Sequence, residues 1–199
     1  MPAATNIGIV ILAAGSSSRF GEPKQLLQYD DKNLLQHTID AAVNSNAKTV
    51  IVVLGAKADL ISKEIDKTKV HIVGNTEWQE GMASSVRTGL STLQKGSPST
   101  DAVIFMVCDQ PFVSSSLINN LIDTHIDTGK PIVTCNYGEV VGPPALFHKN
   151  FFDELMELKG DVGARKIIQQ HKDKVTTLLF TEGKIDIDTK EDYEELNNS

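Results

Sequence analysis

The chain has 199 residues, of which 40% are hydrophobic, and 19 Lys and Arg against 26 Asp and Glu give a net charge of -7 at pH 7. This acidic balance argues against a general surface for nucleic acid or anionic membranes, although a few placed cations can still hold a small anionic ligand. No apolar run approaches the ~20 residues that a membrane-spanning helix needs. We therefore expect neither nucleic acid nor membrane as a partner, and the length predicts a single domain over residues 1–199.

Strand and helix signals alternate along the chain. Buried apolar runs predict strands at 7–12, 49–54, 70–73, 102–107, 131–135, near 145–147, 175–180 and 184–187. Amphipathic spacing predicts helices at 33–44, 58–65, about 82–94, 114–126, near 149–158, 162–171 and from Thr189 onward. This order predicts a three-layer α/β/α fold with a mostly parallel central sheet, in which ligands gather outside the carboxyl ends of the strands.

The compartment is predicted from two features. No Lys or Arg precedes the apolar run at 7–12, so the basic region of a signal peptide is missing. The two cysteines, Cys108 and Cys135, lie inside apolar segments and predict buried thiols in a reducing environment. We therefore expect a cytoplasmic protein.

The first predicted strand runs directly into a turn with small residues, hydroxyls and cations. Ala13, Ala14 and Gly15 keep side-chain bulk away, so a ligand can approach the backbone there. Backbone N–H groups and serine hydroxyls can donate to an anion, and Arg19 and Lys24 can neutralise a polyphosphate. Neither GxxxxGK[ST] nor GxGxxG is present, so an ordinary turn with two solvated cations is the alternative on spacing alone.

Residues 12–27, LAAGSSSRFGEPKQLL, resemble the LAAGxSxRxGxxKxLL signature of nucleotidyltransferases with a glycosyltransferase-A-like fold. Within this family, the double alanine at 13 and 14 is similar to the molybdenum cofactor cytidylyltransferase branch. The guanylyltransferase branch more often has a second glycine in that place. The resemblance implies a Rossmann-like, nucleotide-diphospho-sugar transferase fold in which Arg19 and Lys24 are catalytic and hold the triphosphate. The nucleotide-binding residues implied here are Leu12, Ala13, Ala14, Gly15, Ser16, Ser17 and Ser18.

A second motif, NTEWQEGMASSVR at 75–87, follows the third strand and opens a helix. Gly81 permits a tight turn, and the first helical turn exposes unpaired N–H donors that suit a base edge or a phosphate. Plain helix capping is the alternative, and Arg87 fits equally as a salt-bridging residue. The segment resembles the family's NxxWxxGMxSSLRxGL, which implies contacts with base and ribose from Asn75, Gly81, Ser84 and Ser85.

Two acidic segments are candidates for a Mg²⁺ site. Asp109 ends a buried strand, where a carboxylate is costly unless paired or metal-bound, and Mg²⁺ takes one or two carboxylates besides substrate phosphates. Its match to the family's D-x-P element implies that Asp109 is a catalytic metal ligand. Residues 185–192, IDIDTKED, resemble DIDTPEDL, and alternation along a strand predicts Asp186 and Asp188 on one side. We favour Asp188 as the second ligand, with helix capping as the alternative for both segments.

Two further segments resemble the family's pocket for the second substrate. GPPALF at 142–147 resembles GHPVLF, with Pro143 in place of the usual histidine, and KGDVGAR at 159–165 resembles GDxGAR. The implied acceptor-binding residues are Gly142, Pro143, Asp161, Gly163 and Arg165. For Asp161, a helix cap is the alternative. The five motifs fall in family order and divide the domain into a nucleotide-binding part at about 7–112 and an acceptor-binding part at about 113–193.

The reaction that the resemblance implies is transfer of CMP from CTP to the phosphate of a molybdopterin-type cofactor, with Mg²⁺ as cofactor and release of pyrophosphate. It also implies transient contact with a molybdoenzyme or its chaperone. The alternatives are a guanylyltransferase or a sugar- or alcohol-phosphate nucleotidyltransferase of the same fold, and, from another class, a non-catalytic molybdenum-cofactor carrier or maturation protein. A phosphate monoester is already anionic at neutral pH, so no strong general base is expected.

Overall fold

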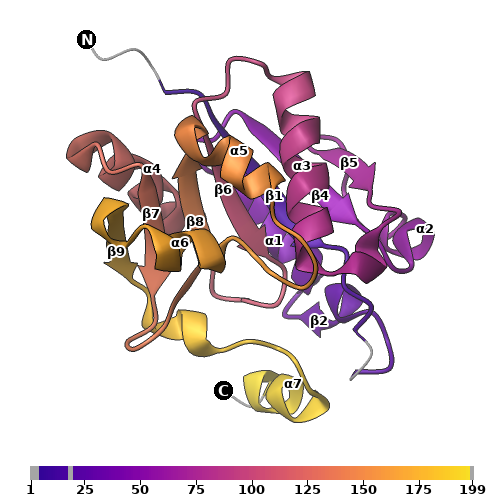
Figure 1. Ribbon diagram of the computed structural model, residues 1–199. Coiled ribbons are helices and arrows are strands. Elements are labelled where there is room, and N and C mark those ends of the chain that lie inside the picture. Colours follow the sequence, from indigo (N-terminus) through magenta and orange to yellow (C-terminus); the bar gives the residue numbers. More distant parts are fainter. Residues whose placement is uncertain (1–4, 18–19, 198–199) are drawn as a thin grey trace.

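The computed structural model describes residues 5–17 and 20–197, and its centre is a seven-stranded sheet (Figure 1). The strand order is β5-β4-β1-β6-β8-β7-β9. These strands are β1 (Ile7–Ala13), β4 (Thr49–Leu54), β5 (His71–Gly74), β6 (Ala102–Val107), β7 (Ile132–Asn136), β8 (Val141–His148) and β9 (Val175–Leu179). A small antiparallel pair forms from β2 (Gln28–Tyr29) and β3 (Lys32–Asn33).

The direction of the strands brings the predicted motifs to one edge of the sheet. The pairs β1–β4, β1–β6, β4–β5 and β7–β9 are parallel, whereas β8 runs antiparallel to both β6 and β7. The carboxyl ends of the parallel strands and the amino end of β8 therefore meet at the same side, which we call the carboxyl edge. The mostly parallel sheet predicted from the sequence is confirmed.

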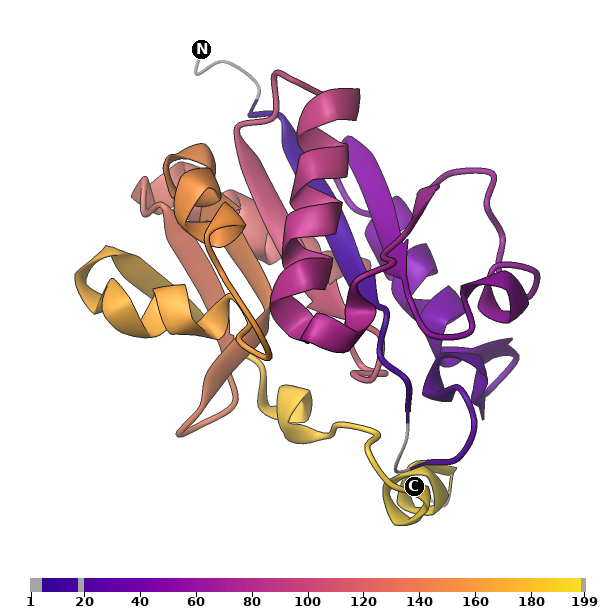
Figure 2. The same cartoon turned by 45° about the vertical axis from the view of Figure 1, so that its right-hand side comes forward.

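Helices cover both faces of the sheet, as Figure 2 shows for α3 across β1 and β4. On one face, α1 (Leu34–Val43), α2 (Ala58–Ile61) and α4 (Ser115–Thr128) pack against alternate strand residues such as Ile9 and Ile11. On the other, α3 (Met82–Gly96), α5 (Phe152–Met156) and α6 (Arg165–Gln170) pack against residues such as Val10. Short 3-10 helices are η1 (Lys24–Leu26), η2 (Trp78–Glu80), η3 (Lys149–Phe151), η4 (Lys172–Lys174) and η5 (Thr181–Lys184).

Several predicted boundaries move, and one predicted strand is wrong. The helix expected at 58–65 ends at Ile61, and the helix expected from 162 begins at Arg165 because the left-handed Gly160 (φ 66°) opens a loop before it. The strand expected near 145–147 spans Val141–His148. At 184–187 there is no strand, because the chain leaves β9 through η5 and then crosses the carboxyl edge.

This crossing segment leads to the last helix, α7 (Lys190–Asn197), which lies below the sheet in Figure 2. Ile187 is fully buried in a cluster with Phe20, Leu27, Leu34 and Leu196. Its backbone N–H donates to the carbonyl of Asp109 over 3.0 Å. The apolar and polar alternation at 185–188 therefore reflects a buried isoleucine in a crossing segment, not strand pairing.

Two other predictions concern thiols and membranes. Cys108 and Cys135 are both buried free thiols, as predicted, and burial raises the pKa of each to about 12. Among the residues that the structure describes, no helix has the length and apolar character needed to cross a membrane.

The close packing of α3 on the sheet depends on glycine at position 89. A Cβ there would overlap Val10 Cγ1 and lie 3.0 Å from Val53 Cγ2. We expect Gly89→Ala to lower the free energy of unfolding by about 1–3 kcal/mol, the usual cost of overpacking a core. Gly96→Ala in the same helix meets nothing within 4 Å and should be neutral or stabilising. Urea unfolding measures both variants, and equal stability would contradict this account.

Candidate active site

Two adjoining cavities open along the carboxyl edge. The first, of about 460 Å³, lies between the loop after β1 and the start of α3. The second, of about 600 Å³, lies between the end of β6 and the start of β8. Met82, Val107 and Asp109 line both cavities. Ligands in the two cavities would therefore meet at this shared wall.

Most residues predicted to bind a nucleotide face the first cavity. Its lining includes Leu12, Ala13, Ala14, Gly15, Ser16, Lys24, Gly81, Ser85 and Asp109. Ser18 and Arg19 lie outside the described residues. The open space around Gly15, where no atom lies within 4 Å of an added Cβ, leaves its backbone accessible.

Three other predicted residues, Ser17, Asn75 and Ser84, are not part of this lining. Ser17 contacts Gln25 and Lys24 instead, whereas Asn75 and Ser84 contact each other. Both are buried, and Asn75 Nδ2 donates to Ser84 Oγ over 2.8 Å and to Ser85 Oγ over 3.0 Å. Asn75 Oδ1 accepts from the N–H of Glu77. The geometry gives Asn75 and Ser84 a bracing position behind the cavity wall, with Ser85 in front of them.

The loop after β1 closes around a buried carboxamide that sequence reasoning missed. Gln25 is only 1% exposed, and its Nε2 donates to the carbonyls of Ala13 and Gly15, each over 3.0 Å. Ser17 has a left-handed backbone (φ 54°), and its Oγ donates to Gln25 Oε1 and accepts from the N–H of Lys24. The one available signal was a polar residue between Lys24 and two leucines of the signature.

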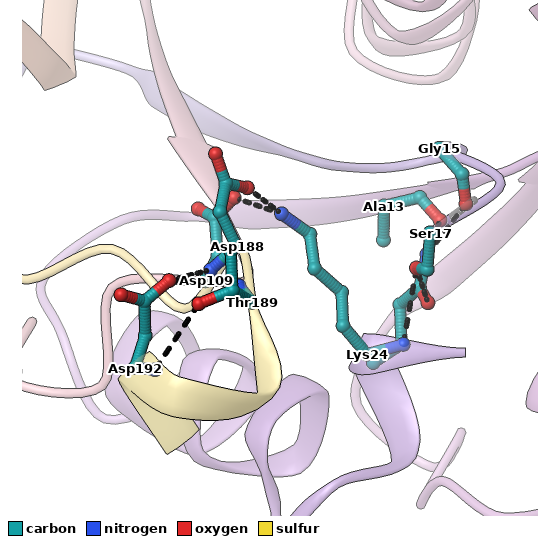
Figure 3. Close-up of polar contacts among 9 residues, drawn as sticks. Ala13, Gly15, Ser17, Lys24, Asp109, Asp188, Thr189 and Asp192 are labelled. Carbon is teal, nitrogen blue, oxygen red and sulfur yellow. Dashed lines mark hydrogen bonds and ion pairs between the residues drawn. The ribbon is translucent and has the colours of Figure 1, made fainter. Parts of the chain in front are cut away.

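Lys24 brings two predicted metal ligands together (Figure 3). Its Nζ donates to Asp109 Oδ2 over 2.5 Å and to Asp188 Oδ1 over 3.0 Å. The side chains of Lys24 and Asp109 are 17% and 20% exposed. Burial disfavours the charged form of Lys24, but the charge of Asp109 and the hydrogen bonds to both carboxylates raise the pKa of Lys24 above its ordinary value. The side chain of Lys24 therefore remains protonated and positively charged at neutral pH.

The start of α7 leaves the carboxylate of Asp188 facing Lys24. Thr189 and Asp192 cap the helix reciprocally: Thr189 Oγ1 accepts from the N–H of Asp192, and Asp192 Oδ2 accepts from the N–H of Thr189 (Figure 3). Asp192 Oδ2 also accepts from the N–H of Asp188. The side chain of Thr189, not that of Asp188, therefore caps the helix.

Gln110 links three segments beside Asp109. Its side chain is buried, and Nε2 donates to Tyr137 Oη over 3.0 Å and to the carbonyl of Gly183 over 2.9 Å. Tyr137 Oη in turn donates to the carbonyl of Pro143. These hydrogen bonds hold the end of β6, the β7–β8 hairpin and η5 in place relative to one another. Sequence reasoning assigned no role to Gln110 or Tyr137.

The second cavity contains three of the five residues predicted for an acceptor site, together with charges that were not predicted there. Gly142, Pro143 and Arg165 line it, together with Lys184 and Asp186, and residues 137–141 at the tip of the β7–β8 hairpin contribute Tyr137, Glu139, Val140 and Val141. Partial burial and the charge of Asp109 raise the pKa of Asp186 to about 6. A third, largely apolar cavity of about 330 Å³ lies alongside and includes Gly163 and Asp161 in its lining.

Contacts between α3 and the loop before α6 join the two halves of the site. Gly81 (φ 118°) lies so close to this loop that an added Cβ would be 2.6 Å from Asp161 Cα. The first N–H groups of α3 are already used, because Met82 N–H donates to Asp161 Oδ1 and Ala83 N–H donates to the carbonyl of Gly160. Asp161, expected at the acceptor, therefore also borders the first cavity.

Arg87 has the salt-bridging role left open from sequence. It makes a two-pronged ion pair with Glu80, over 2.9 and 2.5 Å, and donates to the carbonyl of Leu158. Glu80 Oε1 also accepts from the N–H of Gly160. These contacts hold the 158–161 loop against the start of α3.

The donor set fits a divalent cation that also binds a substrate phosphate. Within the described residues, no three His, Cys, Asp or Glu side chains are grouped to hold a metal ion. The carboxylates of Asp109 and Asp188 nevertheless converge on one cationic atom, Lys24 Nζ. Mg²⁺ needs only one or two carboxylates when phosphates and waters complete its shell.

Mostly parallel α/β sheets with a cleft at the carboxyl edge are typical nucleotide-binding folds. The family model described as MobA-like NTP transferase domain matches residues 9–175. The chain therefore belongs to the MobA-like NTP transferase family and is a nucleotidyltransferase.

Known proteins of similar sequence and structure extend this comparison. Rv0371c from Mycobacterium tuberculosis H37Rv is 32% identical with a TM-score of 0.85, covering 99% of this chain and 100% of that one. Its complex with manganese has also been solved (30% identity, TM-score 0.82, 98% and 100% coverage). Nicotine blue oxidoreductase from Paenarthrobacter nicotinovorans is 28% identical over 81% of this chain and 80% of its own. Purine catabolism protein PucB from Bacillus subtilis (strain 168) is 26% identical over 93% of each.

Loss of the buried carboxamide should destabilise the loop after β1. We expect Gln25→Leu to lower the free energy of unfolding by about 1–3 kcal/mol, because two carbonyls lose their buried donor. Gln28→Leu, at an exposed position three residues on, is the matched control and should change stability by less than about 0.5 kcal/mol. Thermal and urea unfolding measure both. A Gln25→Leu variant as stable as the control would show that these hydrogen bonds are dispensable.

The raised pKa of Asp186 predicts a pH-dependent cost to stability. The folded pKa of about 6 exceeds the ordinary 3.8, so the folded protein binds this proton more tightly than the unfolded chain does. Ionised Asp186 therefore destabilises the fold above about pH 6, and its effect disappears below about pH 4. Without added metal, Asp186→Asn should raise the melting temperature at neutral pH, and the gain should shrink as the pH falls through this range. A gain that does not vary with pH would contradict the assignment.

Proposed function

We propose that this protein transfers CMP from CTP to the phosphate of a molybdopterin-type cofactor and releases pyrophosphate. The observation that carries the proposal is the ammonium of Lys24, which lies between Asp109 and Asp188. Asp109 belongs to the wall shared by the two cavities. The shared wall suits the α-phosphate of a nucleotide, because a group at this wall can be reached from both the first and the second cavity.

The first cavity supports the nucleotide half of the proposal. Small residues at 13–15 and the open backbone of Gly15 leave room for a triphosphate. Lys24 supplies charge at this cavity, and Arg19 is proposed as the second cation of the loop. The choice of CTP rests on Ala13 and Ala14, which match the cytidylyltransferase branch of the signature.

The second cavity supports a phosphate-bearing acceptor. Arg165 and Lys184 both line it and can pair with a phosphate monoester. Gly142 and Pro143 line both this cavity and the apolar cavity beside it, which offers space for a ring system. The acceptor-binding roles of Gly163 and Asp161 are proposed from their place in that apolar lining.

The chemistry asks for charge control rather than a strong base. The acceptor phosphate is anionic at neutral pH and can attack the α-phosphorus without losing a proton first. Asp109 and Asp188 would hold Mg²⁺, whose charge offsets that of the triphosphate. Lys24 would pair with the phosphates and stabilise the departing pyrophosphate. The braced loop would keep its N–H groups aimed at the substrate without reorganisation.

A second candidate is transfer to a different phosphate-bearing acceptor, and one observation favours it. Pro143 lines the second cavity where the family usually has a histidine, so one hydrogen-bonding side chain is replaced by an apolar ring. The relatives named for nicotine blue and for purine catabolism carry names that do not mention molybdopterin. The second cavity therefore also fits a phosphate-bearing acceptor other than molybdopterin.

A pyrophosphate-release screen with the four ribonucleoside triphosphates and Mg²⁺, with and without molybdenum cofactor, tests the proposal. We expect release with CTP only when the cofactor is present. Release with GTP, or with a sugar phosphate in place of molybdopterin, would support the alternatives of the same fold. Nucleotide or cofactor binding without any release would support a carrier.

The same assay tests the residue roles. Lys24→Ala and Asp109→Ala should each reduce turnover by about 100-fold or more, the usual loss when one charge-stabilising group is removed. Both variants should stay folded, as judged from the melting temperature. Lys95→Ala, at an exposed position near the far end of α3, is the control and should retain normal turnover. Near-normal turnover in either site variant would remove its proposed role.

A further inference from the structure

Lys24 already occupies the point where the carboxylates of Asp109 and Asp188 converge. These are the two carboxylates assigned to Mg²⁺ above, and this inference rests on that assignment. We propose that Lys24 and the divalent cation compete for the same oxygens, so that Lys24 serves as a placeholder that must leave when the metal binds. The triphosphate, by offering the ammonium a new anionic partner, then makes metal and nucleotide bind together.

The first step is electrostatic. Nζ of Lys24 is 2.5 Å from Asp109 Oδ2 and 3.0 Å from Asp188 Oδ1, so both carboxylates direct an oxygen at one cation. Lys24 and Asp109 are largely shielded from solvent, at 17% and 20% exposure, so salt screens their interaction weakly. A divalent ion on the same oxygens would be repelled strongly by an ammonium that stayed in place.

The second step concerns which parts can move. The backbone of Lys24 is fixed, because its N–H donates to Ser17 Oγ and it begins η1. Asp109 and Asp188 are tied through their main chains to Ile187 and Asp192. The main chains that carry the two carboxylates are therefore held, and the longest and most flexible of the three side chains is the lysine stem, a chain of four carbons.

The third step is where the ammonium goes. Lys24 lines the first cavity beside Gly15 and Ser16, where the triphosphate is proposed to lie. A rotation of its side chain can exchange carboxylate partners for phosphate partners without a change in the backbone. Binding of the nucleotide should then strengthen binding of the metal, and the reverse must hold by the same factor.

The test measures Mn²⁺ binding without nucleotide, from the electron paramagnetic resonance signal of free Mn²⁺. Lys24→Met should bind Mn²⁺ at least about tenfold more tightly than the wild type, because the competing charge is gone. Lys184→Met removes the same charge from the second cavity and should change the affinity by less than about twofold. Lys24→Met combined with Asp109→Asn should lose the gain. Equal or weaker Mn²⁺ binding by Lys24→Met overturns the proposal.

A second readout covers the case in which Lys24→Met is less stable. A ligand raises the melting temperature according to its affinity for the folded state. Mn²⁺ should therefore raise the melting temperature of Lys24→Met more than that of the wild type, and an equal rise overturns the proposal. The outcome is independent of turnover. Absence of pyrophosphate release in the wild type would defeat the proposed function, whereas absence of tighter Mn²⁺ binding would defeat this inference alone.

Discussion

The contact between one ammonium and two carboxylates organises the carboxyl edge of this protein. Lys24 lies 85 residues from Asp109 and 164 residues from Asp188 in the sequence, and a single Nζ atom reaches both. Three segments that follow different elements therefore share one charged centre. Lys24 and Asp109 are largely shielded from solvent, at 17% and 20% exposure, whereas Asp188 is 46% exposed, so the pair with Asp109 is the costlier of the two to break. The C-terminal segment in particular is drawn across the sheet toward this point.

Around this centre, neutral polar side chains hold the backbone in place. Gln25 braces the loop after β1, and Gln110 ties the end of β6 to Tyr137 and Gly183. Each carboxamide is buried and bonds mainly to main-chain or hydroxyl groups. The backbone segments around the charged centre are therefore braced, whereas the side chain of Lys24 at the centre is flexible. That combination suits a reaction between anions, in which positions must be fixed in advance while one cation changes partners.

The sequence predicts the layers of this fold well, because buried strands need both faces covered and read as apolar runs. The sequence also predicts that Lys24 and Asp109 lie at one edge of the sheet, because both follow parallel strands. It fails at 184–187, where the burial of Ile187 against Phe20 mimics strand alternation. It also fails at Gln25 and Gln110, whose roles depend on three-dimensional neighbours. Asn75 and Ser84 show the same limit, because a motif does not say which polar residues face a cavity and which brace its wall.

The tip of the β7–β8 hairpin is a part of the site that can vary independently of the rest. Among the described residues, positions 137–141 contribute to the wall of the second cavity and none of them to that of the first. By contrast, the loop before α6 is fastened to α3 by Glu80, Arg87 and Gly160, so a change there would disturb both compartments. Tyr137 is held by Gln110 and Pro143, so divergence toward new acceptors is least constrained at positions 138–141, where residues can be exchanged while those proposed to handle the triphosphate are inherited intact.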